Sequence, residues 1–280
     1  MSASITTKPA TVSAWPVIAT LSQRELVRFF RQKNRVFGAL VQPIIFWLLF
    51  GAGLGSARVG TTDDNRLDYA HFFPGTLVMI LLFTAIFATI SIIEDRREGF
   101  LQGVLVAPVP RWSIVMGKVL GGAAIAMLQG IMFLFLGWVT GKLGWFQVIS
   151  PTTTAVQWIA AIALMLVISI ALTALGFLIA WRMDSTQGFH AIMSVFLLPM
   201  WLLSGAFFPM DVGGWLGWIV RLNPLTYGVA GLRHYLQNEG VAGAGLPSLS
   251  LCWIVSLAFA AVTFAAAWSI AGTRSTGDLL

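Results

Sequence analysis

Residues 69–99 of the 280-residue chain read YAHFFPGTLVMILLFTAIFATISIIEDRREG. No Asp, Glu, Lys or Arg occurs from Tyr69 to Ile93, and five charged residues then follow in succession from Glu94 to Glu98. A helix needs about 20 consecutive, mostly apolar residues to cross the hydrocarbon core of a bilayer. The stretch therefore predicts a membrane-spanning helix that ends abruptly at a charged segment.

The composition extends this prediction to the whole chain. Hydrophobic residues make up 58% and charged residues only 10%, whereas a soluble domain carries about 25% charged residues. The composition therefore argues against a soluble enzyme. The single cysteine, Cys252, excludes a disulfide framework and a cysteine-rich metal site, and we expect no metal. We interpret the net charge of +6 as basic cytoplasmic loops rather than as nucleic-acid binding.

We predict an all-α, polytopic membrane protein that forms a single transmembrane domain over residues 1–280. Its six spanning helices are expected at residues 36–57, 69–93, 117–141, 155–181, 187–208 and 247–272. Two further apolar stretches, Val212–Val220 and Leu222–Leu232, are too short to cross. They predict an outer re-entrant hairpin over residues 207–236, between the fifth and sixth spans.

Basic residues set the expected orientation. If the N-terminus is inside, 12 of the 17 Lys and Arg residues fall in inner segments and 5 in outer ones. An excess of Lys and Arg marks the cytoplasmic loops of membrane proteins. We therefore expect both termini in the cytoplasm, and the protein in the bacterial cytoplasmic (inner) membrane.

The segment before the first span predicts an amphipathic helix over residues 11–35. Four arginines recur every three or four residues, which places them on one side of a helix: Arg24, Arg28, Arg31 and Arg35. Apolar side chains, among them Trp15, Phe29 and Phe30, fall on the opposite side. The pattern is typical of a helix in the membrane interface, with its basic side toward headgroups or a partner. The alternative is a basic run that only precedes the first span.

The charged segment after Ile93 opens the one substantial inner loop, residues 94–111. Its charges alternate in sign, an apolar run including Phe100 and Leu101 follows, and Pro108 and Pro110 end any helix. We expect a short helix on the membrane surface that suits docking to a soluble protein. A solvated loop that only stops translocation is the alternative.

Three motifs, in this order, resemble ABC-2-type transporter permeases. Residues 93–100 (IEDRREGF) followed by 107–111 (APVPR) are similar to the family's inner loop, and residues 198–211 (LPMWLLSGAFFPMD) to the end of its fifth span. Residues 223–227 (NPLTY), followed by 231–233 (GLR), resemble its most recognisable motif. The most similar branch is that of daunorubicin-resistance permeases, which export drugs and polyketides; polysaccharide exporters share the architecture. Residues 213–216 (GGWL) depart from the Pro-x-Trp-Leu pattern of relatives.

The resemblance implies a homodimer, or a paired permease, with two copies of a separate ATP-binding subunit docked below it. The coupling contact to the ATPase would involve Glu94, Asp95, Arg96, Arg97, Glu98, Gly99 and Phe100. The interface helix would carry Arg24, Arg28, Arg31 and Arg35. The outer gate would be shaped by Pro209, Asn223, Pro224 and Tyr227.

The chain has no nucleotide-binding motif of its own. Gly137–Lys142 is one residue short of a phosphate-binding loop, and Leu143 replaces the Ser or Thr that would reach Mg²⁺. We therefore expect no catalytic residue and no cofactor in this chain, with ATP and Mg²⁺ bound by the partner. The cargo would be an amphipathic drug, a lipid-linked molecule or a polysaccharide, moved outward.

The main alternative is a stand-alone secondary transporter or channel with no ATPase partner. Proton- and sodium-coupled carriers keep ionisable groups inside their spans. We expect no charged group inside any of the predicted spans, which favours the ATP-driven hypothesis. A lipid-modifying enzyme is less favoured, because the carboxylates around Glu94 stand beside arginines. The glycine pairs Gly51/Gly55, Gly117/Gly121 and Gly137/Gly141 allow close helix packing, which we expect within one subunit rather than at a dimer seam.

Overall fold

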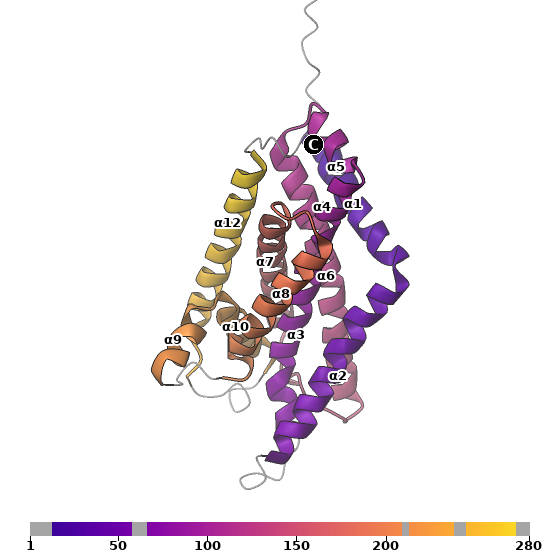
Figure 1. The fold of residues 1–280 in the computed structure, drawn as a ribbon. Helices are drawn as coiled ribbons and strands as arrows, with labels where there is room; N and C mark the ends of the chain where they lie inside the picture. Colours follow the sequence, from indigo (N-terminus) through magenta and orange to yellow (C-terminus); the bar gives the residue numbers. More distant parts are fainter. Residues whose placement is uncertain (1–12, 58–65, 209–212, 238–244, 273–280) are drawn as a thin grey trace, which may run out of the picture.

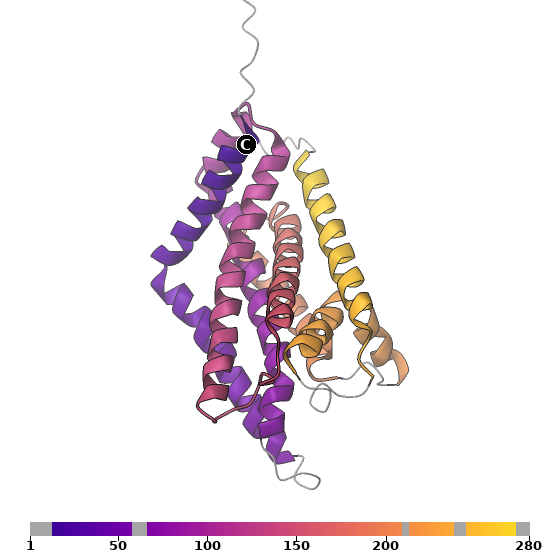
Figure 2. The same ribbon diagram turned by 180° about the vertical axis from the view of Figure 1, so that it is seen from behind.

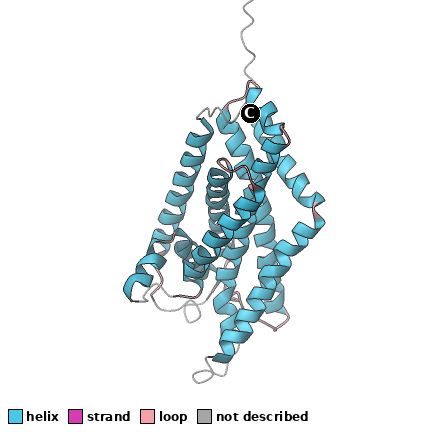
Figure 3. Ribbon diagram, viewed as in Figure 1, coloured by secondary structure: helices cyan, strands magenta, loops and turns pink. Residues whose placement is uncertain are grey.

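The computed structural model describes residues 13–57, 66–208, 213–237 and 245–272, and within these ranges all regular structure is helical (Figure 3). In chain order (Figure 1) the helices are α1 (Ala14–Arg31), α2 (Lys33–Ala57), α3 (Arg66–Ala88), α4 (Ile90–Arg97), α5 (Phe100–Val106), α6 (Arg111–Lys142), α7 (Ala155–Ala180), α8 (Thr186–Trp201), the π-helical turn η1 (Leu202–Ala206), α9 (Gly214–Leu222), α10 (Pro224–Leu236) and α12 (Leu249–Gly272).

Within the described residues, five helical stretches are long and apolar enough to cross a membrane. They are Tyr69–Arg97, Arg111–Lys142, Ala155–Ala180, Thr186–Ala206 and Leu249–Gly272. The all-α, polytopic class predicted from the sequence is confirmed. A shorter apolar segment, Val41–Gly53, lies in α2, so the count of six spans stays a prediction.

Helix α3 lies at the centre of the bundle, packed against α2, α6 and α7 (Figures 1 and 2). Its interior residues, including Phe73, Leu77 and Leu81, are fully buried. Trp47 fastens α2 to this core. Its ring packs edge-on against Phe73 and three other aromatic rings, and its Nε1 donates a hydrogen bond to the Tyr69 carbonyl at 2.9 Å.

Helix α12 lies at the edge of the bundle and exposes an apolar stripe that includes Leu251, Ile254 and Val262. A helix that is apolar on its outer face suits contact with lipid chains. Arg111, at the start of α6, donates to the Ala271 carbonyl at 2.9 Å. The end of α12 therefore lies at the same end of the bundle as α5, the upper end in Figure 1.

Small residues allow the closest helix contacts. A Cβ on Gly117 would lie 2.8 Å from the Cβ of Leu21, and one on Gly121 2.8 Å from the Cβ of Glu25. These two glycines of α6 therefore form the groove in which α1 packs. The pair serves packing within the subunit, as expected from the sequence.

The chain reverses at the lower end of the bundle through η1, where Gly205 adopts φ +76°. A left-handed conformation of this kind favours glycine. Trp201, just before η1, donates from Nε1 to the Gly75 carbonyl at 2.7 Å. Helices α9 and α10 follow at this end, opposite α5 (Figure 1).

Candidate functional site

Helix α1 lies beside the upper half of α6 (Figure 2), with one face buried. Ile18, Leu21, Glu25 and Phe29 form the buried face at helical spacing, whereas Trp15 is exposed. This differs from the expected helix whose apolar side faces lipid. The glycine groove of α6 takes up part of this side, around Leu21, while Trp15 and Phe30 stay exposed, and the arginine side lies next to α4.

Asp95 lies at the centre of a set of ion pairs between α1, α4 and α6. Its carboxylate accepts two hydrogen bonds from Arg24, at 2.7 and 2.8 Å, and one from Arg28 at 2.9 Å. Lys118 of α6 also donates to Asp95, and it donates to Glu25 at 2.5 Å. Three cations therefore converge on one carboxylate from two helices.

Arg28 extends this set to two more carboxylates. One guanidinium nitrogen lies 3.0 Å from Glu94 and 3.3 Å from Glu98. We name the seven connected residues the ion cluster: Arg24, Glu25, Arg28, Glu94, Asp95, Glu98 and Lys118.

The ion cluster is buried at its centre and accessible at its rim. The side chain of Asp95 is 0% exposed and that of Lys118 is 4% exposed, whereas that of Glu98 is 59% exposed. A buried charge is tolerated only when it is paired and hydrogen-bonded. Hydrogen bonding to Asp95 raises the pKa of Arg24, so the arginine stays charged. The cluster thus holds α1, α4 and α6 together.

Arg96 and Arg97 fasten the other side of α4 to the turn between α7 and α8. Arg96 donates to the carbonyl of Trp181 and, at 3.1 Å, to the carboxylate of Asp184. Arg97 donates from Nε to the Asp184 carbonyl at 2.9 Å. Arg96 therefore supplies donors to carbonyls that the end of α7 leaves without helical partners.

The predicted coupling residues divide into an inner and an outer set. Asp95 is buried and points into the bundle, so it is a structural centre rather than a surface contact. Arg97, Glu98, Gly99 and Phe100 are exposed. Gly99 turns the chain at φ +75° into α5, whose Leu101 is buried and so does not belong to the surface expected to dock a soluble protein. The ring of Phe100 lies 3.8 Å from the Arg24 guanidinium carbon.

Of the two remaining arginines of the predicted interface helix, Arg31 has a described side chain and Arg35 does not. Arg31 is exposed and lines a surface hollow together with Glu98. Arg35 falls in α2, and its side chain lies outside the described part of the chain.

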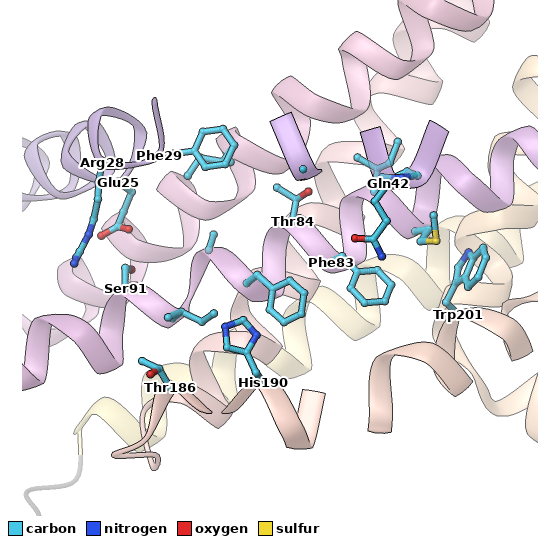
Figure 4. A pocket seen from close by; sticks show the side chains of 18 of the residues that line it. Glu25, Arg28, Phe29, Gln42, Phe83, Thr84, Ser91, Thr186, His190 and Trp201 are labelled. Atoms are coloured by element: carbon cyan, nitrogen blue, oxygen red, sulfur yellow. The ribbon is translucent and has the colours of Figure 1, made fainter. Parts of the chain in front are cut away.

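A cavity of about 510 Å³ lies beside the ion cluster, between α1, α2, α3, α4 and α8. Figure 4 shows Glu25 and Arg28 at one end of it and Trp201 at the other, with Phe83 and His190 between. Most of its lining is apolar, the charged side chains lie at the end next to the cluster, and the neutral polar side chains of Gln42 and Thr84 lie farther along. The cavity therefore has an amphipathic character. Its other lining residues include Phe46, Met79, Ile80, Phe87, Ser91, Glu94, Thr186 and Leu198.

At the lower end, Asn223 fixes the start of α10. Its Nδ2 donates to the carbonyls of Met200 at 2.6 Å and Leu203 at 3.0 Å, and its Oδ1 accepts from the Leu225 amide at 3.0 Å. Pro224 follows as the first residue of the helix, where its missing N–H costs nothing. The NP pair thus caps α10 and satisfies carbonyls at the end of α8.

Of the other two predicted gate residues, Tyr227 lies in the described part of the chain and Pro209 does not. Tyr227 is only partly buried and donates to the Arg221 carbonyl at 2.9 Å. Pro209 lies outside the described residues. Thr226, which the sequence analysis did not single out, is buried and donates to the Val220 carbonyl at 2.6 Å.

Replacing Asn223 by alanine is expected to lower the free energy of unfolding by about 2–3 kcal/mol, because the partly buried carbonyls of Met200 and Leu203 lose its amide donor and α10 loses its cap. Tyr227→Phe is the matched control in the same motif, and it should change the unfolding free energy by less than about 1 kcal/mol. Denaturant unfolding in detergent, followed by tryptophan fluorescence, measures both. Equal effects of the two substitutions would contradict the capping role.

Three further charged residues are buried; only Arg233, within the GLR motif, was quoted in the sequence analysis, and it had no assigned role. Glu25 and Lys118 belong to the ion cluster. Glu25 interrupts the apolar face of α1, and this interruption was the available signal. Arg233 of α10 is 5% exposed and lies 3.3 Å from His71 Nε2. Burial lowers the pKa of Arg233 to about 10, so the guanidinium still carries its charge at neutral pH.

The sequence of the chain is similar to a known family of membrane transporters. A family model described as "ABC-2 type transporter" matches residues 16–236, from α1 to the end of α10. The chain belongs to the ABC-2 type transporter family. An ABC-2 permease is a membrane subunit of a transporter rather than an enzyme, and the family implies pairing with an ATP-binding subunit. The matched region contains the ion cluster, the cavity and the NP pair.

Curated relatives agree with this family over most of their length. The chain is 27% identical over 236 residues to the putative transport permease ycf38 of Cyanophora paradoxa, covering 82% of this chain and 78% of the relative. It is 27% identical over 265 residues to the inner membrane transport permease YadH of Escherichia coli K12, covering 91% and 94%. It is 25% identical over 227 residues to a probable doxorubicin resistance ABC transporter permease, DrrC, of Mycobacterium tuberculosis, covering 80% and 79%. The chain is therefore a multi-pass protein of the inner-membrane permease type.

Proposed function

We propose that this ABC-2 permease exports an amphipathic cargo and is driven by two copies of a separate ATPase subunit, which bind the ATP and Mg²⁺. The ATPase would dock on the exposed surface of α4 and α5, around Glu98 and Phe100. The observation that carries the proposal is the double attachment of α4. Asp95 ties it to α1 and α6, and Arg96 ties it to the α7–α8 turn.

This attachment gives a route from the docking surface to the cavity. Helices α1, α4 and α8 all contribute lining residues, among them Glu25, Glu94 and His190. Buried ion pairs resist separation because each partner alone would be an uncompensated charge. A push on α4 would therefore move α1 and the start of α8 with it, and so change the shape of the cavity.

The exposed faces of α2 and α8 support pairing of two copies. Both helices flank the cavity, and both expose large apolar side chains, which include Phe37, Leu49, Val195 and Phe196. A second copy on these faces would close the cavity toward lipid and place two cavities next to each other. We propose this homodimer, with both termini and α5 on the cytoplasmic side. The upper end in Figure 1 would then face the ATPase.

Replacing Glu98 by arginine tests the docking surface. The side chain is 59% exposed, and among the described residues its one ion pair is with Arg28, so reversal of its charge should spare the fold but alter the contact surface. We expect the permease to lose its stimulation of the partner's ATPase activity and to insert into the membrane normally. The ATPase rate of the purified complex and the membrane fraction of the permease measure the two effects.

Lys142→Glu is the matched charge reversal at the opposite end of α6, and it should keep the stimulation. Normal ATPase stimulation and transport by Glu98→Arg would contradict the docking role. Transport by proteoliposomes that contain this chain without any ATPase would overturn the ATP-driven mechanism, in favour of a secondary transporter.

A further inference from the structure

We infer that the cavity selects amphipathic organic cations and that Glu94 is the group that recognises their positive charge. The inference rests on the proposed function, since it names the class of cargo for the cavity described there. The cluster contains three cations, Arg24, Arg28 and Lys118, against four carboxylates.

The distances show which carboxylate is in excess. The Asp95 carboxylate accepts hydrogen bonds from both terminal guanidinium nitrogens of Arg24, at 2.7 and 2.8 Å. The Glu25 carboxylate accepts one from Lys118 at 2.5 Å. Arg28 is then the one remaining cation of the cluster, and it pairs with both Glu94 and Glu98 in addition to its bond to Asp95. One negative charge is therefore uncompensated within the cluster.

Glu94 is placed to present this excess charge to a bound molecule. It lines the cavity, whereas Glu98 lines a separate hollow on the outer surface. Its side chain is 30% exposed, which leaves room for a ligand group. If a ligand ammonium group paired with the Glu94 carboxylate in place of Arg28, Arg28 would stay paired with Asp95 at 2.9 Å and Glu98 at 3.3 Å. Binding would therefore not strand a buried cation.

The remaining walls fit the apolar body of such a molecule. Aromatic rings contributed by α2, α3 and α8 line the cavity: Phe46, Phe83, Phe87 and Trp201. Aromatic faces carry negative charge density and attract cations as well as flat apolar rings. His190 already lies against Phe87, with ring centroids 5.1 Å apart, on one side of this space.

The size of the cavity agrees with one compact molecule. A volume of about 510 Å³ lies within the range of roughly 300–1,000 Å³ that is typical of drug-sized ligands. Charge at one end and aromatic rings along the length together describe an aromatic amine. A carboxylate-bearing analogue of the same shape should bind more weakly, because Glu94 and Glu25 repel it and Arg28, which also lines this end, is already paired with three carboxylates.

Three pyrene probes with the same ring system test the charge preference. We would measure binding of 1-pyrenemethylammonium, its neutral N-acetyl derivative and 1-pyrenecarboxylate to the purified full-length permease in nanodiscs, by fluorescence and with empty nanodiscs subtracted. We expect the ammonium probe to bind at least about ten-fold more tightly than the N-acetyl probe, and the carboxylate to bind most weakly.

Matched variants locate the preference. Glu94→Gln should bring the ammonium and N-acetyl probes to similar affinity, while Glu98→Gln should keep the ten-fold ratio. Phe83→Ala should weaken both probes about equally and leave their ratio unchanged. Equal affinities in the unsubstituted protein, an unchanged preference in Glu94→Gln, or no binding of any probe would overturn the inference. None of these outcomes alters the separate test of ATPase stimulation by Glu98→Arg, so failure of the cargo class is distinguishable from failure of the transport mechanism.

Discussion

Replacing Asp95 by alanine is expected to lower the free energy of unfolding by about 3–5 kcal/mol, the range found when one partner of a buried ion pair is removed. Asp95 is fully buried and accepts from Arg24, Arg28 and Lys118. Arg24 and Arg28 are about a quarter exposed and can turn toward water, but the Lys118 side chain is only 4% exposed. Most of the loss therefore comes from Lys118, which would keep a single carboxylate partner, Glu25.

Unfolding by denaturant in detergent micelles measures this loss, with Asp184→Ala as the control. Asp184 also pairs with an arginine of α4, but its side chain is 90% exposed, so its removal should cost less than about 1 kcal/mol. Replacing Lys118 by methionine in the Asp95→Ala background should cost less than the same replacement in the unsubstituted protein, because Asp95 and Lys118 are in direct contact and their effects are coupled. An Asp95→Ala protein as stable as the Asp184→Ala control would show that the cluster does not hold the helices together.

The same substitution should also uncouple transport. Without Asp95, α4 keeps its attachment to the α7–α8 turn through Arg96 but loses its bonds to Arg24 and Lys118. The link from α4 to α1 would then rest on the partly exposed pairs of Arg28 with Glu94 and Glu98 alone, so a push on α4 should move α1 less than it moves α8. Transport measured at a temperature where the variant is folded separates this effect from the loss of stability.

The helices could be predicted from the sequence because the length of an uncharged run reports directly on the thickness of the hydrocarbon layer. The run from Tyr69 to Ile93 lies within a single spanning stretch in the structure. The charged segment after it was identified as well. The structure differs in continuing the helix to Arg97, so Asp95 faces the bundle interior rather than the surface.

The partners of the arginine stripe could not be predicted in this way. Periodicity places Arg24 and Arg28 on one side of α1, but it does not say what lies opposite that side. Asp95 is 71 residues from Arg24 along the chain, and the two meet only because α1 packs into the groove at Gly117 and Gly121. The expectation of charge-free spans fails for a related reason. Lys118 is seven residues inside α6 and is buried there, since Glu25 and Asp95 neutralise it.

The cavity was not predicted either. Phe46, Phe83 and Leu198 are ordinary apolar residues of spanning helices, and such residues serve equally well against lipid, protein or a ligand. Only the packing of α2, α3 and α8 leaves a space between them. The NP pair is the opposite case, because Asn before Pro is a strong local signal for the start of a helix. Its place at the start of α10 agrees with this local reading.

Replacing Gly121 by leucine is expected to displace α1 from α6 and to abolish transport. Even a Cβ at this position would lie 2.8 Å from Glu25 Cβ, 2.9 Å from Glu25 Cγ and 3.2 Å from the Ser22 Cα. Since the last of these atoms is backbone, α1 itself must move. Overpacking of this kind costs about 1–3 kcal/mol. The larger consequence is that Arg24 and Arg28 leave Asp95, which removes the link between the docking surface and the cavity.

Glycine substitutions of increasing size on α6 should cause increasing damage. Gly141→Ala is the control, because the nearest atom to its Cβ would be the Phe146 carbonyl oxygen at 3.7 Å, an ordinary contact. It should keep normal unfolding and transport, whereas Gly121→Ala should be intermediate and Gly121→Leu the most damaged. The measurements are the unfolding midpoint and the stimulation of the partner's ATPase by each variant. A leucine at position 121 should push α1 away from α6 and so separate Arg24 from Asp95. A Gly121→Leu protein with normal stimulation would therefore contradict the role of α1.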